Sequence, residues 1–527
     1  SEEISKDNIA LRVMNLANDT KISQDNSLLG DPTETAMVQY GLDKNYDVRE
    51  ELVNIPRIAE VPFDSTRKLM TTIHQLEDGK YLVATKGAPD MLLDRVTKIE
   101  KHGEVSAFTE DDRTTLMKLN KEMATQALRV LAMAYKVIDT LPETVDTDSI
   151  EHDLIFAGLV GMIDPERKEA AAAIKVAQSA GIRTIMITGD HRDTAQAIAK
   201  RLGILRPDQE DGVLTGGELN DISDEELERT VETYSVYARV SPEHKVRIVK
   251  AWQKNGKVVS MTGDGVNDAP SLKQADIGVG MGITGTEVSK GASDMVLADD
   301  NFETIVVAVE EGRKVFANIQ KAVQYLLSAN FGEVMTMFVA TMAGWSILEP
   351  IHILWINLVT DVFPAIALGL EEAEADIMNH PPRGKSSNFL SNGVLPSIFY
   401  QGFFEGGITL FVFWYATHIA NWGNPVGETM AFATLGLIQL FHAFNVKSVY
   451  KSLGTVGAFK NKLFNYAILV SAVMLLSVMV IPGLTTVFDV AILTAEQWLF
   501  VVGAAFSIVP IVEIAKAIMR AMGMDKD

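Results

Sequence analysis

The chain has 527 residues, of which 47% are hydrophobic and 22% charged, and its formal net charge at pH 7 is −22. This length predicts more than one domain, and the acidic balance argues against a general nucleic-acid-binding surface, which needs clustered positive charge. The sequence has no cysteine, which excludes disulfides and thiolate metal sites and fits a reducing cytoplasm. Its first residues are acidic and polar, so no signal peptide is predicted, and the missing initiator methionine leads us to expect a piece of a longer protein.

Residues 1–152 have the pattern of a mixed α/β domain. The alternating stretches Lys68–His74 and Lys80–Thr85 flank an Asp-Gly turn and predict a β-hairpin. Phe63 precedes the first strand, and Lys86–Asp90 follows the second. An aromatic ring that stacks on adenine and an ammonium group that meets a phosphate are therefore expected near one another. A hairpin with an exposed lysine is, however, also common in sheets that bind no ligand.

From residue 153 to residue 314, short apolar strands alternate with helical patterns, which predicts a parallel sheet covered by helices. Each predicted helix is followed directly by a glycine that stops it. The expected strands are Phe156–Ile163, Thr184–Ile187, Val258–Met261 and Ile277–Val279, and the expected helices are Arg167–Ala180 and Asp193–Leu202.

The most informative stretch is Thr262–Pro270, which directly follows one of these apolar strands. It places Asp264, Asn267 and Asp268 at the carboxyl end of the strand, where open α/β sheets bind their ligands. Clustered oxygen ligands beside backbone amides suit a magnesium ion that holds a phosphate. A surface Asp-Gly turn is the alternative, but such a turn does not need these three polar side chains together.

Two further segments offer groups to the same phosphate. Thr188-Gly189-Asp190 follows a predicted strand and presents a hydroxyl and backbone amides, and Lys245 presents a point charge. On their own, a three-residue motif and a helix lysine are also typical of solvated surface.

The stretch Thr262–Pro270 resembles the hinge motif of the P-type cation-transporting ATPases, whose phosphorylation domain belongs to the haloacid dehalogenase group. The resemblance implies that Thr188 binds phosphate, Lys245 supplies charge and Asp264 holds magnesium during transfer to an aspartate nucleophile. That aspartate belongs to a DKTGT motif ahead of the nucleotide-binding domain, and the 527 residues contain no such motif. We therefore expect the nucleophile to lie outside this chain. The implied catalytic residues are Thr188, Gly189, Asp190, Lys245, Asp264, Asn267 and Asp268.

Motifs of the family's nucleotide-binding domain also have counterparts. Lys86–Asp90 is similar to its KGAPE motif, with Asp in place of Glu, and Phe63–Lys68 resembles the segment with the adenine-stacking Phe and a phosphate-facing Lys. Gly30–Ala36 resembles an acidic motif that approaches the adenine, and Leu128–Ala132 contains the arginine that reaches the phosphates. The residues that the resemblance implies for ATP are Glu34, Phe63, Lys68, Lys86, Gly87 and Arg129.

The second half of the chain contains apolar segments that are long enough, or nearly so, to span a bilayer. The first begins with polar residues and is expected to extend as a stalk into the soluble part. Lysines and arginines fall in the loops on one side of the predicted membrane, so the positive-inside rule places the soluble half in the cytoplasm. The six predicted spans are residues 315–345, 351–370, 394–420, 429–449, 463–480 and 498–519.

Polar residues inside such segments are costly and are candidates for function. Asn330 and Glu333 are three residues apart and share one face of the first segment. Asn357, Thr360 and Asp361 share one face of the second by the same spacing. Two carboxylates with amide and hydroxyl oxygens form an oxygen-only site that suits calcium. A polar patch that joins helices is the alternative.

The segments Ser328–Glu333 and Leu354–Asp361 resemble membrane segments of the sarco/endoplasmic-reticulum type calcium pumps, in which the matching residues coordinate calcium. Gln439 aligns with a glutamate ligand of those pumps, so one charge is missing here, and sodium-potassium pumps also have a glutamine there. Asn357 is more similar to the calcium branch. Pro364 cannot donate a backbone amide and is expected to loosen the helix beside the site.

The sequence thus predicts a multi-domain α/β plus α-helical membrane protein. Its expected parts are a partial nucleotide-binding domain (1–152), a haloacid-dehalogenase-like parallel-sheet phosphorylation domain (153–314) and a transmembrane domain of six helices (315–527).

The expected function is ATP- and magnesium-dependent export of calcium across a bacterial plasma membrane. The expected partners are the amino-terminal part of the pump and the lipid bilayer, with no nucleic acid. A sodium or manganese pump of the same family, a non-catalytic nucleotide-binding membrane partner and a membrane-anchored phosphatase are the alternatives.

Overall fold

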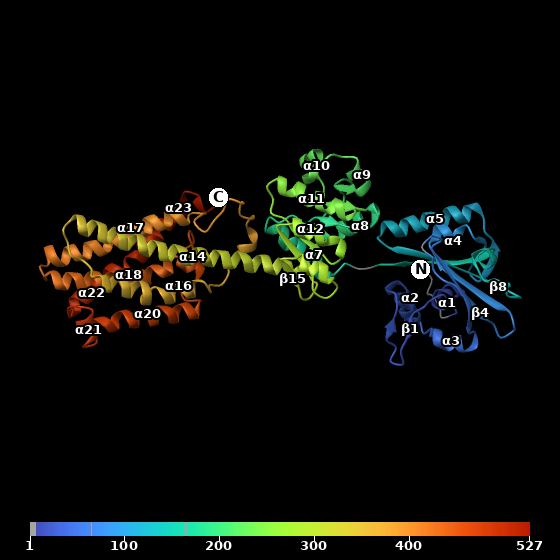
Figure 1. The fold of residues 1–527 in the computed structure, drawn as a ribbon, viewed down its shortest axis with the longest axis horizontal. Coiled ribbons are helices and arrows are strands. Elements are labelled where there is room, and N and C mark those ends of the chain that lie inside the picture. Colours follow the sequence, from blue (N-terminus) through green and yellow to red (C-terminus); the bar gives the residue numbers. More distant parts are fainter. Residues whose placement is uncertain (1–6, 65, 164–165, 527) are drawn as a thin grey trace. The chain divides into compact units, whose positions relative to one another are not determined.

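The computed structural model describes residues 7–64, 66–163 and 166–526 (Figure 1). Contacts between Cα atoms divide the chain into two compact units. The first unit comprises residues 1–174 and 184–296, and the second comprises residues 175–183 and 297–527.

The first unit begins with a seven-stranded sheet in the order β3-β4-β5-β8-β9-β6-β7 (Figure 1). Side chains of its strands alternate between two apolar cores: Leu82 and Ala84 of β5 join the core beneath α1, whereas Val83 joins the core beneath α4. The strands are β3 Arg57–Val61, β4 Leu69–Gln75, β5 Tyr81–Gly87, β6 Val96–Lys101, β7 Glu104–Ala107, β8 Arg129–Ile138 and β9 Leu154–Met162.

Helices and one small hairpin flank this sheet. α1 starts at Asn8, whose side chain accepts hydrogen bonds from the amides of Ala10 and Leu11. The elements are α1 Ile9–Leu16, β1 Lys21–Ile22, β2 Leu28–Leu29, α2 Pro32–Asp43, α3 Val48–Asn54, α4 Pro89–Leu93, α5 Glu110–Thr125 and α6 Thr147–Ile150.

The predicted hairpin is confirmed, because β4 and β5 pair antiparallel from Leu69–Gly87 to Gln75–Tyr81. The strand predicted at Phe156–Ile163 also forms, as β9, but its expected sheet is wrong. β9 pairs antiparallel with β8 and parallel with β6 in the seven-stranded sheet. An apolar run does not reveal which neighbour a strand will choose, so the pattern alone could not make this assignment.

The rest of the first unit contains short parallel strands and helices, as predicted, but the single parallel sheet expected there is wrong, because the described strands form two separate three-stranded sheets, β10-β12-β11 and β13-β14-β15. β10 and β11 both pair parallel with β12, and β13 pairs parallel with β14. α8 ends at Gly203, which adopts a φ of +80°, so the predicted glycine stop is confirmed. The strands are β10 Met186–Ile187, β11 Val213–Thr215, β12 Val236–Ala238, β13 Ser260–Gly263, β14 Ile277–Met281 and β15 Met295–Leu297.

The helices of this region connect successive strands. The helices predicted at Arg167–Ala180 and Asp193–Leu202 are confirmed as α7 and α8. The bounds are α7 Lys168–Ser179, α8 Arg192–Leu202, α9 Gly216–Asn220, α10 Asp224–Thr230, α11 Pro242–Lys254, η2 Val266–Asp268, α12 Ala269–Gln274 and α13 Glu287–Gly291.

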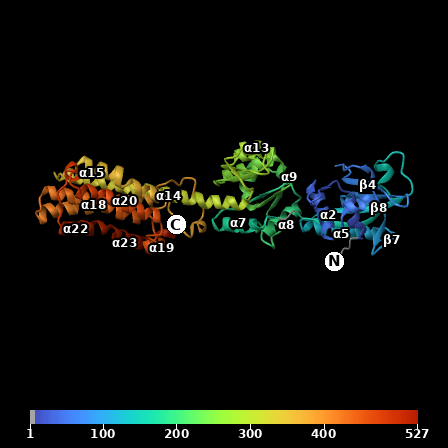
Figure 2. The same ribbon diagram turned by 90° about the horizontal axis from the view of Figure 1, so that it is seen from below.

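The second unit is helical and is built on α14, a helix of 41 residues that runs from Phe302 to Met342 (Figures 1 and 2). At 1.5 Å per residue it is about 60 Å long, roughly twice the thickness of a hydrocarbon core, as expected for a membrane segment with a stalk. The further helices are α15 Pro350–Trp355, η3 Ile356–Thr360, α16 Val362–Leu368, α17 Val394–Trp414, η5 Tyr415–Ile419, α18 Asn424–Asn445, α19 Leu453–Val456, α20 Lys462–Val480, α21 Leu484–Val487, α22 Ala495–Phe506 and α23 Ile508–Ala521.

Three helical stretches among the described residues are long and apolar enough to cross a membrane by themselves: Pro350–Leu368, Lys462–Val480 and Ala495–Ala521. Helices also cover the other three predicted spans, as α14, α17 and α18. Polar side chains in these helices lower their mean hydropathy. The count of six spans therefore stays a prediction.

Hydrogen bonds join the end of α7 to α14 within the second unit. The guanidinium of Arg313 on α14 donates hydrogen bonds to the carbonyl oxygens of Ala180 (2.8 Å), Ile377 (2.9 Å) and His380 (3.0 Å). The hydroxyl of Ser179 adds a hydrogen bond to the carbonyl of Met378 (3.2 Å). The stalk part of α14 is thus tied to a helix that lies more than 130 residues earlier in the chain.

We predict that Glu151 is a main stabilising group of the seven-stranded sheet. Its side chain is fully buried and binds the Nε of Arg67 (2.7 Å) and the hydroxyl of Thr71 (2.8 Å). Removing one partner of a buried ion pair costs about 3–5 kcal/mol. Glu151→Ala is expected to accelerate amide hydrogen exchange in β4 and β5 by about 100-fold or more, since each tenfold corresponds to about 1.4 kcal/mol.

The control is Asp139→Ala, which removes an exposed ion pair (3.8 Å to Lys80) at the edge of the same sheet. It is expected to leave the exchange rates unchanged, because exposed pairs contribute little. Equal exchange rates in wild type and Glu151→Ala would contradict the prediction.

Candidate functional site

Five of the six predicted cation ligands lie in the interior of the helical unit. Thr360 and Gln439 are fully buried, and Glu333 and Asp361 are only 5% and 2% exposed. Asn357 is partly buried, with its Oδ1 atom buried. Asn330, although it lies on the same helix as Glu333, is exposed and stays apart from this buried set.

Two helices and one irregular segment position these side chains. α14 carries Glu333, whose Oε1 accepts a hydrogen bond from the Nε2 of Gln439 on α18 (3.0 Å). Asp361 follows the irregular segment η3, and its Oδ1 accepts a hydrogen bond from the hydroxyl of Tyr325 on α14 (3.2 Å). The two carboxylates are thus held by groups from neighbouring helices.

The irregular segment η3 is π-helical and ends at Thr360, four residues before Pro364. The amide of Asp361 donates to the carbonyl of Ile356, five residues earlier, at 2.9 Å. The ring of a helical proline displaces the carbonyl four residues before it, here that of Thr360, which favours such a widened turn. The loosening that we predicted from Pro364 is therefore confirmed.

The buried set contains acceptor oxygens without a hydrogen-bond partner among the described residues. These atoms are Asn357 Oδ1, Thr360 Oγ1, Gln439 Oε1 and both carboxylate oxygens of Glu405. A buried acceptor without a partner costs about 1–3 kcal/mol, so each needs an explanation. A bound cation supplies one, because hydroxyl, amide and carboxylate oxygens are the ligands of calcium.

Our sequence analysis missed Glu405, which lies on α17 and is 0% exposed. The signal was present, because Glu405 is an ionisable residue in the middle of the apolar segment 394–420. No group of three or more acidic or histidine side chains in the described parts of the chain is close enough to hold one ion together. The buried acceptors without a partner therefore include neutral amide and hydroxyl oxygens as well as carboxylates.

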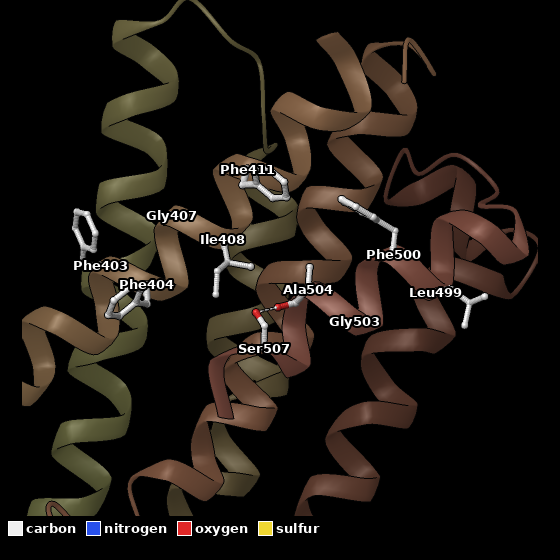
Figure 3. Close-up of a pocket in the computed structure, with 10 residues that line it drawn as sticks. All are labelled: Phe403, Phe404, Gly407, Ile408, Phe411, Leu499, Phe500, Gly503, Ala504 and Ser507. Atoms are coloured by element: carbon white, nitrogen blue, oxygen red, sulfur yellow. Dashed lines mark hydrogen bonds between the residues drawn. The ribbon is translucent and has the colours of Figure 1, made fainter. Parts of the chain in front are cut away.

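A separate apolar groove of about 570 Å³ lies between α17 and the helices α22 and α23 (Figure 3). Phe404, Phe411 and Phe500 are among its lining side chains, and Ser507 donates its hydroxyl to the carbonyl of Ala504. A lining without charged groups does not suit a cation.

In the first unit, the loop after β13 is built around Asp268. One carboxylate oxygen of Asp268 accepts hydrogen bonds from the amides of Asp264 (3.1 Å) and Gly265 (3.0 Å), and the other accepts one from the Nζ of Lys245 on α11 (2.6 Å). A Cβ at Gly263 would lie 2.6 Å from the Cβ of Asp268, so this position requires glycine. Asp268 therefore shapes the loop, whereas Asp264 and Asn267 are exposed.

The charge on Asp268 is stabilised by its partners. Burial alone would raise the pKa of Asp268, but the hydrogen bond from Lys245 and those from the backbone amides outweigh it, and the pKa is lowered. The side chain is therefore anionic at neutral pH. It holds the ammonium group of Lys245 beside the loop.

The loop Thr188-Gly189-Asp190 follows β10. Ile187, directly before Thr188, packs against the apolar cluster that contains Met261 of β13. The amide of Thr188 bonds to the carbonyl of Tyr237 in β12 (2.9 Å), and its hydroxyl accepts from the amide of Asp190 (3.1 Å). Ile187 of β10 and Met261 of β13 thus pack in one core, and the predicted joint role of the two loops in binding a phosphate stays a prediction.

Segments that are far apart in sequence meet at the predicted nucleotide site. The Nζ of Lys86 binds the Oε1 of Glu34 (2.8 Å), and the guanidinium of Arg129 donates to the hydroxyl of Thr33 (3.3 Å). Burial lowers the pKa of Lys86, and the nearby carboxylate of Glu34 opposes this shift. Lys86 is therefore paired with another predicted site residue.

The other predicted nucleotide-binding residues are two exposed side chains and a glycine. Phe63 is 62% exposed, and Lys68 is exposed with a φ of +56°. A Cβ at Gly87 would lie 2.2 Å from the carbonyl oxygen of Lys68, so only glycine fits there. An exposed aromatic ring and an exposed ammonium group are free to meet a nucleotide.

Three family models match the chain. The model "P-type ATPase, cytoplasmic domain N" matches residues 8–169, "haloacid dehalogenase-like hydrolase" matches residues 99–276, and "Cation transporting ATPase, C-terminus" matches residues 345–518.

Curated relatives resemble nearly the whole chain. Calcium-transporting ATPase 1 of Bacillus cereus is 45% identical over 521 residues, which cover 96% of this chain and 58% of that protein. The calcium-transporting ATPase of Bacillus subtilis is 43% identical over 475 residues (90% and 53%). The probable cation-transporting ATPase F of Mycobacterium tuberculosis is 37% identical over 520 residues (95% and 56%).

The chain therefore spans somewhat more than half of the length of these relatives. Models for both the soluble and the helical part match in the order expected for one family. The chain belongs to the P-type cation-transporting ATPases.

Proposed function

We propose that this chain is the carboxyl-terminal part of an ATP-driven pump that exports calcium from the cytoplasm. The observation that carries the proposal is the set of buried, unpartnered oxygens around Glu333 and Asp361. Such atoms destabilise an apolar bundle unless a ligand binds them. Carboxylate, amide and hydroxyl oxygens together favour a hard dication such as calcium.

In the proposed cycle, the soluble part transfers the γ-phosphoryl group of ATP to an aspartate that lies outside this chain. Phe63 and Glu34 would hold the adenine, and Lys68 and Arg129 would face the phosphates. The backbone amides of the loop after Thr188 and the ammonium of Lys245 would bind oxygens of the transferred group.

Asp264 and Asn267 are the residues that would hold magnesium. They fit this ion because their side chains are exposed at the end of β13, while Asp268 fixes the loop on which they lie. Magnesium in such sites keeps several waters and binds through one or two carboxylates. When bound, it neutralises charge on the phosphoryl oxygens.

We further propose that the helical part crosses a bacterial plasma membrane six times. The crossings would be α14, α15 with α16, α17, α18, α20, and α22 with α23. Residues 1–152 and 153–314 would then be the cytoplasmic nucleotide-binding and phosphorylation domains. Export of a dication against a negative-inside potential costs about 4–5 kcal/mol per 100 mV, which is a load that ATP can drive.

The alternative functions predict different experimental observations. A sodium or manganese pump would use the same machinery, and ATPase activity of the complete protein stimulated by sodium but not by calcium would favour the first. A non-catalytic partner would need a second chain that carries the nucleophile. Our preference for calcium is supported by two buried carboxylates together with the asparagine at position 357.

The proposal predicts that Glu333 and Asp361 are both required for transport. Glu333→Gln and Asp361→Asn each remove one charge at nearly constant size, and each is expected to reduce calcium uptake at micromolar calcium at least tenfold. A tenfold change corresponds to about 1.4 kcal/mol, which is less than a charged ligand normally contributes. The measurement is radioactive calcium uptake into inverted vesicles that contain the complete protein.

Glu428→Gln is the control for these variants. Glu428 lies on α18 and binds the hydroxyl of Ser346 (2.9 Å), apart from the buried set. It is expected to transport like wild type. Calcium uptake at the wild-type level by both Glu333→Gln and Asp361→Asn would contradict the proposed calcium site.

The proposal also predicts that Lys245 acts in phosphoryl transfer. Lys245→Ala removes the charge that lies 2.6 Å from Asp268 and is expected to reduce phosphoenzyme formation from radiolabelled ATP about 100-fold, as loss of one preorganised charge does in other enzymes. Lys250→Ala, an exposed lysine on the same helix, should form phosphoenzyme normally. Equal phosphoenzyme levels in the two variants would argue against this role.

A further inference from the structure

Glu405 is a buried acid to which the sequence analysis assigned no role. Its side chain is 0% exposed, and both carboxylate oxygens have no hydrogen-bond partner among the described residues. The groups that act on it electrostatically are two further acids, Asp361 and Glu333. A buried carboxylate in such surroundings is strongly destabilised unless a cation or a proton compensates its charge.

Close packing of two helices places this side chain against Gly332, the residue before Glu333. α17 packs along α14, and a Cβ at Gly332 would lie 3.2 Å from the Cβ of Glu405 and 3.3 Å from its Oε2. A Cβ at Gly406 would lie 2.9 Å from the carbonyl oxygen of Gly332. Glycine at both positions lets the backbones approach, as small residues do between membrane helices. The carboxylate of Glu405 therefore lies beside the residue that precedes Glu333.

Gln439 reaches the same part of α14 from another helix. Its Nε2 donates to the Oε1 of Glu333, while its own Oε1 has no partner. α17 and α18 pack against each other as well as against α14. The position next to Glu333 thus receives a neutral amide from α18 and a carboxylate from α17.

We propose that Glu405 supplies the cation site with negative charge that the amide of Gln439 does not, without being one of the carboxylates that hold the ion directly. This inference rests on the proposed function and adds a residue to its site. Glu405 acts on a dication bound between Glu333 and Asp361 by its charge. The number of carboxylates sets the calcium affinity of such sites.

The test is equilibrium binding of radioactive calcium to the complete protein in detergent. Glu405→Gln keeps the shape of the side chain and removes the charge, and it is expected to raise the half-saturating calcium concentration at least tenfold. The double variant Glu405→Gln/Gln439→Glu places a carboxylate on α18 beside Glu333, and this carboxylate replaces the charge that is lost from α17. This double variant is expected to bind calcium within about threefold of wild type, since the count of charges is restored.

Two further variants separate the possible failures. Glu513→Gln changes another glutamate of the bundle, which lies 4.0 Å from Lys516, and it should bind calcium like wild type. Glu333→Gln reports on the proposed function itself. If Glu333→Gln binds normally, the proposed site is wrong. If Glu333→Gln loses binding while Glu405→Gln stays within twofold of wild type, only the role of Glu405 is overturned.

Melting temperatures distinguish a role of the Glu405 charge in calcium binding from a role of the Glu405 side chain in helix packing. Glu405→Gln should melt at or above the temperature of the calcium-free wild type, because it removes an uncompensated buried charge. A lower melting temperature, or calcium binding that the double variant does not recover, would show that Glu405 supports the packing of α17 on α14 and would overturn the proposal.

Discussion

The burial of acceptor oxygens without protein partners is the constraint on which the helical unit depends. Glu333, Thr360, Asp361, Glu405 and Gln439 lie in the interior of an apolar bundle, where water does not compensate their polarity. The hydrogen bonds from Gln439 to Glu333 and from Tyr325 to Asp361 satisfy only part of this set. The remaining acceptor oxygens are buried without a partner among the described residues, and the proposed cation would supply one.

Backbone irregularity and small residues give this site its form. The π-helical turn before Asp361 follows from Pro364, and the approach of α17 to α14 follows from Gly332 and Gly406. At the other end of α14, Arg313 binds carbonyl groups of α7 and of the segment after α16. Glu333 and Arg313 thus lie on the same continuous helix.

Much of this arrangement could be predicted from sequence, because periodicity and motif spacing are local properties. The hairpin β4–β5, the helices α7 and α8 and the loop around Asp268 follow from such patterns. The sheet that β9 joins could not be predicted, since a strand's neighbours are chosen by the whole fold. Asn330 has the right spacing to share a face with Glu333, yet it is exposed, because one face of a helix is broader than one site. Glu405 was overlooked although the buried polar side chains of Gln401 and Thr409 lie four residues before and after it, because an apolar segment does not show from sequence which of its faces is turned toward the other helices.

The most direct measurement is a crystal structure of the complete protein grown with calcium, with anomalous scattering used to locate the ion. Our account predicts a peak between α14, α16 and α18, with oxygens of Glu333 and Asp361 at about 2.3–2.6 Å, the usual calcium–oxygen distances. A calcium-saturated crystal whose anomalous peaks all lie elsewhere, or in which these two carboxylates bind no ion, would contradict the account.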